Sequence, residues 1–222
     1  MNKKWQEYVE KFISDDSLEL KVLKEGNLLE KDNRNILEHL LKARVSAEVL
    51  CDLLGLGEKE KDNVVSAATI HDSFVLEEKA YIRQKSKQKA GANYLDLQTI
   101  KAQSANRLRE IGFPKEVIDL TDENITHEEG GPKSLPTKIS FLVDAILSGP
   151  EIVDVPKRFD LTRRDWRSDL QVFDEETKMG NEKYWNDFFK GAPGYGDKSH
   201  DIVQLETAER ICKEFAETLK EP

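Results

Sequence analysis

Apolar residues recur at spacings of three and four along almost the whole 222-residue chain, and this periodicity constrains the fold more than any other feature. The pattern is clearest between Asn33 and Gly55. There the apolar residues are spaced four, three, four, three and four apart: Ile36, Leu40, Ala43, Ala47, Leu50 and Leu54. Such a period places one side of a helix against a core. Because no two segments alternate as paired strands would, we predict an all-α fold with one helical domain over residues 1–222.

Residues that favour caps and turns separate the expected helices. Asp15, Asp16 and Ser17 precede one helix, Gly112 and Pro114 stop another, and Pro136 opens the helix that Gly149-Pro150 ends. Residues 74–95 are charged and less periodic. The helices are expected over about residues 5–12, 18–23, 33–54, 61–72, 95–111, 117–125, 136–146 and 202–219.

Composition limits the class of protein. Charged residues reach 35% and the net charge is −9, which argues against general nucleic-acid binding. The two cysteines, Cys51 and Cys212, fall within helical patterns and are expected to be buried or half-buried free thiols. The N-terminal segment does not resemble a signal peptide, and no apolar run approaches the roughly 18 residues of a membrane span. We therefore expect a cytoplasmic protein that does not enter a membrane.

A histidine and an aspartate stand together, His71-Asp72, at the end of the apolar run VVSAATIHDSF. A buried carboxylate needs a charged partner, and a divalent cation suits it. His39 and Asp144 also lie beside core positions of predicted helices. Imidazole and carboxylate together suit Zn, Mn, Fe, Co, Ni or Mg. Alternatively, each histidine is a satisfied core residue, and Asp144 pairs with a lysine or arginine.

These four residues, in this order, resemble the HD superfamily of metal-dependent phosphohydrolases. The pattern of that family is a His, a His-Asp pair and a distant Asp. The matching segments are EHLLKARVSAEVLCDLLGL, SAATIHDSF and ISFLVDAILSG. The resemblance implies an HD-type helical bundle with a core over about residues 33–149 and a helical extension over 150–222. It further implies that His39, His71, Asp72 and Asp144 surround one metal ion, whose open positions admit water and a phosphate oxygen.

The middle of the chain resembles the HD-GYP branch, which binds further metal ions. In LQTIKAQSANRLREIGF, Gln103 stands at the position of an additional His ligand, and Thr126-His127 replaces a His pair. The resemblance therefore implies one firm metal site and a second that is weak or absent, and it argues against cleavage of cyclic dinucleotides. His127 has three readings: a catalytic acid, a remaining ligand of the second site, or an inert loop residue.

Two functions follow as hypotheses. The first is a hydrolase that cleaves a phosphoester of a nucleotide or other small phosphate, in which Asp72 also orients water and His127 or Glu128 transfers protons. Lys138, at the start of the helix that carries Asp144, is one candidate for holding the phosphate, and the sequence does not decide among the basic candidates. The second is an HD-fold module that binds a nucleotide or metal for regulation without turnover. The sequence leaves the oligomeric state open.

Other groups fit less specific roles. The basic residues between 79 and 89 are expected to form mostly a solvated face, and Arg163, Arg164 and Arg167 are a further candidate phosphate patch. The aromatic cluster Tyr184–Phe189 is expected to pack in a core, with a protein-binding surface as the alternative.

Overall fold

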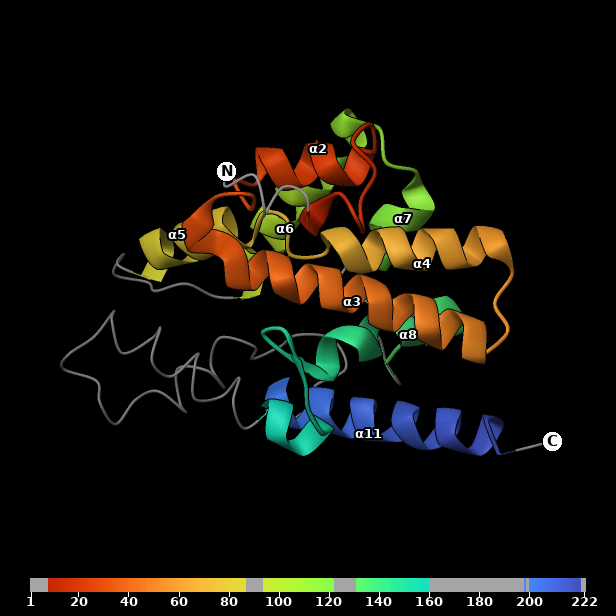
Figure 1. Ribbon diagram of the computed structural model, residues 1–222. Helices are drawn as coiled ribbons and strands as arrows, with labels where there is room; N and C mark the ends of the chain where they lie inside the picture. The colour runs from red at the N-terminus through yellow and green to blue at the C-terminus, as the bar shows by residue number, and fades with distance from the viewer. Residues whose placement is uncertain (1–7, 87–93, 122–130, 160–197, 199, 221–222) are drawn as a thin grey trace.

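The computed structural model describes residues 8–86, 94–121, 131–159, 198 and 200–220. This part of the chain is mostly helical, as the periodicity predicts (Figure 1). The elements are α2 (Leu18–Glu25), η1 (Lys31–Asn33), α3 (Arg34–Leu53), α4 (Glu58–Ile70), α5 (Val75–Ser86), α6 (Tyr94–Ile111), α7 (Lys115–Leu120), α8 (Leu135–Ala145), β1 (Leu147–Ser148), β2 (Glu151–Ile152) and α11 (His200–Thr218). Residues 155–159 form a further helical turn.

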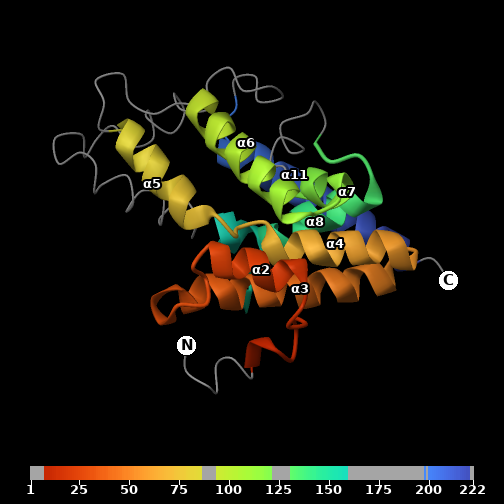
Figure 2. The same ribbon diagram turned by 90° about the horizontal axis from the view of Figure 1, so that it is seen from above.

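An antiparallel pair, α3 and α4, forms the centre of the molecule (Figures 1 and 2). α3 ends in a glycine-dependent cap. The N–H of Leu56 donates to the carbonyl of Cys51 at 3.0 Å, and Gly55 takes a φ of +69°, which glycine adopts without strain. This cap reverses the chain within four residues. α3 and α4 therefore lie side by side.

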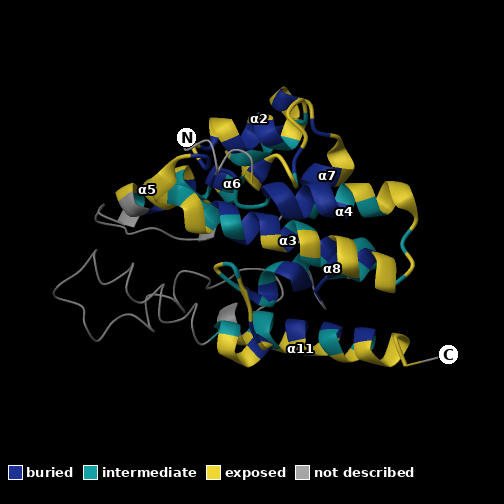
Figure 3. Cartoon of the chain, viewed as in Figure 1, coloured by how far each residue is buried: buried dark blue, intermediate teal, exposed yellow. Residues whose placement is uncertain are grey.

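The remaining helices cover the two sides of this pair. α2, α5, α6 and α7 lie on one side, whereas α8 lies on the other, between the pair and α11 (Figure 1). The largest core lies where α3, α4, α8 and α11 meet, and the faces turned toward it are buried (Figure 3). Its fully buried members include Ala43, Ala47, Val64, Ile139 and Ile211. The outer face of α11 is exposed and charged, which accounts for part of the high charge content.

The turn between α4 and α5 carries the His-Asp pair. α4 ends at Ile70, and the N–H of Ser73 donates to the carbonyl of Ile70 at 2.9 Å, so the chain turns tightly through His71 and Asp72. Gly26, which ends α2, lies directly against this turn. A Cβ atom added to Gly26 would stand 1.9 Å from the Ser73 carbonyl oxygen. The absence of a side chain at Gly26 therefore lets α2 approach the backbone of the turn.

A short antiparallel hairpin follows α8, and the sequence-based expectation that the chain has no strand pair is wrong at this point. β1 pairs with β2 through a two-residue turn at Gly149-Pro150, with Leu147 opposite Ile152. Gly149 has a φ of +55°. Strands of two residues are too short to show alternation, and a Gly-Pro pair equally marks the end of a helix.

Several predicted boundaries are confirmed and others are wrong. Ser17 caps α2 and Pro136 lies in the first turn of α8, as predicted. α4 begins at Glu58, three or four residues earlier than expected, and α5 is a helix where the charged sequence showed little periodicity. Ile125 and the start of the first expected helix lie outside the described residues. No helix in the described part of the chain is both long and apolar enough to cross a membrane.

Candidate metal centre

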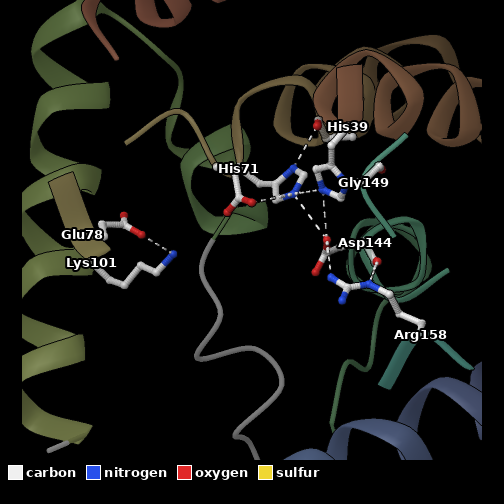
Figure 4. Close-up of polar contacts among 9 residues, drawn as sticks. His39, His71, Glu78, Lys101, Asp144, Gly149 and Arg158 are labelled. Carbon is white, nitrogen blue, oxygen red and sulfur yellow. Dashed lines mark hydrogen bonds and ion pairs between the residues drawn. The ribbon is translucent and has the colours of Figure 1, made fainter. Parts of the chain in front are cut away.

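Three separate elements bring the predicted ligands together (Figure 4). His39 comes from α3, His71 and Asp72 from the turn after α4, and Asp144 from the last turn of α8. The two imidazole Nε2 atoms are 3.2 Å apart. Oδ1 of Asp144 lies 3.2 Å from Nε2 of His39 and 3.6 Å from Nε2 of His71, and Oδ2 of Asp72 lies 3.9 Å from Nε2 of His71.

The other ring nitrogen of each histidine is fixed by a backbone carbonyl. Nδ1 of His39 lies 3.0 Å from the carbonyl oxygen of Gly149, and Nδ1 of His71 lies 2.9 Å from that of Ala68. Since a carbonyl oxygen only accepts, each Nδ1 carries the hydrogen that it donates. In the neutral rings both Nε2 atoms then present lone pairs to each other and to Asp144. Such a cluster of acceptors needs a cation between its members.

The spacing of these atoms fits a metal ion. Metal–nitrogen and metal–oxygen bonds of about 2.1 Å put neighbouring ligand atoms roughly 3.0–3.4 Å apart around one ion. The distances that join His39, His71 and Asp144 lie within or close to this range. Ligand atoms of His39, His71 and Asp72 lie within 4.8 Å of one another, so this cluster could hold a metal ion. The mixed nitrogen and oxygen donors suit Zn and the first-row transition ions better than Mg.

Electrostatics also favour a cation at this point. Burial lowers the pKa of His71, but the charges of Asp72 and Asp144 outweigh burial and raise this pKa to about 9. Partial burial opposes ionisation of Asp144, yet hydrogen bonds from His39 and His71 and the charge of Arg158 hold its pKa well below the usual value. Without a metal, the cluster therefore binds a proton. A metal ion would replace that proton.

Exposure differs among the ligands. The side chain of His39 is 9% exposed, whereas that of Asp144 is 46% exposed. The imidazoles are thus held in the protein interior, and the side chain of Asp144 lies partly at the surface. A small molecule could approach the cluster from the Asp144 side.

Of the remaining predicted site residues, Lys138 and Gln103 are described by the structure, and neither is among the residues that contact this cluster. Lys138 lies in the first turn of α8, where its ammonium pairs with Glu214 of α11. Gln103 is exposed on α6. His127, Glu128 and the Arg163–Arg167 patch lie outside the described residues, as does the aromatic cluster at 184–189.

Three features near the centre were missed from the sequence. Arg158 brings its guanidinium to Asp144, with Nη2 3.7 Å from Oδ1. The carbonyl of Gly149, in the hairpin, orients His39, and Gly26 supports the turn that carries His71. The sequence shows Lys157-Arg158 as a basic pair. However, Arg158 follows the hairpin, so the three-and-four spacing of a helix does not relate it to the predicted ligands.

A second buried charged group lies between α5 and α6 (Figure 4). The carboxylate of Glu78 is 2.8 Å from the ammonium of Lys101 and accepts from the hydroxyl of Ser104 at 2.7 Å. Because both partners of Glu78 belong to α6, these contacts hold α5 against α6. They explain how the charged, weakly periodic segment after His71-Asp72 forms a packed helix.

The chain was compared with models of protein families, with curated proteins and with solved structures. None of the three comparisons found a match.

Proposed function

We propose that the protein is a metal-dependent hydrolase of phosphoesters. The observation that carries this proposal is the pair of Nε2 atoms 3.2 Å apart, each on a ring whose Nδ1 is tied to a carbonyl, with Asp144 beside both. Four converging acceptors from three elements form a centre that a divalent cation would complete. A bound divalent ion lowers the pKa of a coordinated water and neutralises charge on a phosphoryl group.

The residues of the chain have separate parts in this chemistry. His39 and His71 hold the ion through Nε2, and the carbonyls of Gly149 and Ala68 keep these rings in the required tautomer. Asp144 and Asp72 supply negative charge. Asp72 is 29% exposed, so its carboxylate is also able to accept a hydrogen bond from the attacking water and orient it.

The HD superfamily resemblance supports this proposal through the order of the four residues along the chain. The contact of His39 with Asp144 joins residues that are far apart in the sequence. We propose a nucleotide or another small phosphate as substrate, because an acidic protein with a net charge of −9 repels long polyanions. Among the candidate ions we favour Mn, Fe, Co, Ni or Zn.

The test is hydrolysis of a generic aryl phosphoester, and of a panel of nucleotides, by protein loaded with Mn, Co, Ni or Zn. We expect turnover that a chelator abolishes and that Asp72→Ala reduces by at least about 100-fold, because that variant loses a ligand and the group that orients water. Asp119→Asn is the matched control, since Asp119 is exposed on α7 and pairs with Lys115. Equal turnover in the Asp72 and Asp119 variants would refute the proposal.

A binding module without turnover is the second candidate. The observation that favours it is the exposed position of Gln103, because the resemblance places an additional ligand there. Melting temperatures measured with a panel of nucleotides, beside an assay of phosphate release on the same samples, separate the two functions. A nucleotide that raises the melting temperature without release of phosphate would favour the binding module.

A further inference from the structure

The C-terminal half of α3 carries three exposed apolar side chains along one line. Val45, Val49 and Leu53 are 37%, 50% and 57% exposed. Because these residues are spaced by four, they form one continuous ridge on the helix surface, which we call the α3 ridge. α4 and α8 pack against other sides of α3, and no described helix covers its exposed side (Figures 1, 2 and 3).

The residue types of the α3 ridge are unusual for a solvated helix surface. Valine is a weaker helix former than alanine, lysine or glutamate, because branching at Cβ restricts its side chain. Neighbouring exposed positions of the same helix hold charged residues: Lys42, Glu48 and Asp52. Single exposed apolar residues are common on proteins, whereas apolar residues joined in one patch are typical of a surface that another molecule covers.

The charges that flank the α3 ridge favour a second copy of the chain as this molecule. Four residues have the symmetric spacing three, four, three: Lys42, Val45, Val49 and Asp52. In an antiparallel copy of the same helix, Val45 therefore lies opposite Val49. Lys42 then lies opposite Asp52. A parallel copy would instead place each charged residue opposite its own kind, which is unfavourable.

Both charged groups are accessible to a second copy. Lys42 is exposed. The side chain of Asp52 is 60% exposed, although it pairs with Lys61 of its own chain. A carboxylate has two oxygens and accepts several hydrogen bonds, so the pair with Lys61 does not prevent a contact with Lys42 of a second copy.

We propose that the α3 ridge is the contact of a two-fold symmetric dimer in which the α3 helices of two copies pack antiparallel. The inference does not depend on the proposed function, because none of the candidate metal ligands belongs to the ridge. One helix from each copy makes the contact, so we expect a weak dimer with a dissociation constant on the order of 100 µM.

Sedimentation of the full chain at concentrations from about 5 to 1,000 µM measures this association. Val49→Glu is expected to weaken it by at least about tenfold, because the carboxylate would be buried against Val45 of the second copy. Ile202→Glu is the matched control, since Ile202 is 40% exposed on α11. It should stay within about twofold of the unaltered protein. Melting temperatures of both variants show that each remains folded.

A pair of charge reversals tests the antiparallel arrangement itself. Lys42→Glu and Asp52→Lys each bring like charges together at both ends of the contact, so either variant alone should associate at least about threefold more weakly. An equimolar mixture of the two should recover the association, because every negative position then meets a positive one.

Three results would overturn the inference. The first is a chain that stays monomeric at all these concentrations, which would point to a different protein as the occupant of the ridge. The second is equal association of Val49→Glu and Ile202→Glu, which would assign the dimer to another surface. The third is a mixture of the charge-reversal variants that associates no better than either variant alone.

Discussion

Gly26→Ala should disturb the metal centre even though Gly26 is not a ligand. The Cβ of the alanine would stand 1.9 Å from the carbonyl oxygen of Ser73, whereas Cβ contacts below 3.0 Å are essentially never found. The turn that carries His71 and Asp72, or the end of α2, must therefore move by at least about 1.1 Å. The neighbour is backbone, so a side-chain rotation cannot relieve the overlap.

The size of this shift determines the expected loss of stability and the expected loss of metal affinity. Overpacking of this kind costs about 1–3 kcal/mol of stability, against which the lower chain entropy of alanine returns roughly 0.4–1 kcal/mol. In a chain of this length each kcal/mol corresponds to a decrease of roughly 2–4 °C in melting temperature. Ligands of a site must hold their positions to within about 0.5 Å, so a displaced turn should weaken metal binding by roughly 10–100-fold.

Thermal unfolding and metal titration on the same samples test both effects. Gly57→Ala is the matched control, because Gly57 also caps a helix at negative φ and a Cβ there would meet nothing within 4 Å. We expect Gly57→Ala to keep the melting temperature and the metal dissociation constant close to their original values. If Gly26→Ala matched this control in both measurements, the close approach of α2 to the turn would not support the site.

Three further predictions concern single groups. Burial raises the pKa of the Cys51 thiol to about 11, and the side chain is fully buried. In Cys212→Ser protein at pH 8, a thiol-specific disulfide reagent should therefore leave Cys51 unmodified in the native state and react with it after unfolding. Fast reaction in the native state would contradict this prediction. The pKa of His71 is raised to about 9, and a metal ion binds only the neutral imidazole. The apparent metal affinity, measured by calorimetric titration, should therefore rise by up to about tenfold per pH unit from pH 6 to 8.5. An affinity that does not change with pH would refute the assignment of His71 as a metal ligand. Lys138→Ala should lower stability by no more than about 1 kcal/mol, through loss of a partly exposed pair with Glu214, and should leave the metal dissociation constant and the hydrolysis of the aryl phosphoester unchanged. Slower hydrolysis would return Lys138 to the site.

The helices were predictable wherever one face is buried and the other solvated. α3 shows the three-and-four spacing over its full length, and its apolar members Leu40, Ala43 and Ala47 are fully buried. α5 was missed because its contacts with α6 are largely polar, through Glu78, and such contacts leave no apolar period. The hairpin was missed because its strands have only two residues each.

The candidate ligands were predictable because a charged or imidazole group beside a core position stands out against an apolar pattern. His39, His71 and Asp72 form one cluster in the structure, and Asp144 contacts both histidines. Arg158 was missed because its approach to Asp144 depends on the path of a hairpin, which helical spacing does not encode.

Metal content tests the central claim most directly. Protein purified without chelators, incubated with Mn or Zn and dialysed, is analysed for metal per chain beside two variants, Asp144→Asn and the exposed control Asp119→Asn. We predict about one equivalent of metal in the unaltered protein and in Asp119→Asn, and a large loss in Asp144→Asn, because one of the converging oxygens then carries no charge. Equal metal content in both variants, or none in the unaltered protein, would contradict the assignment of this cluster as a metal centre.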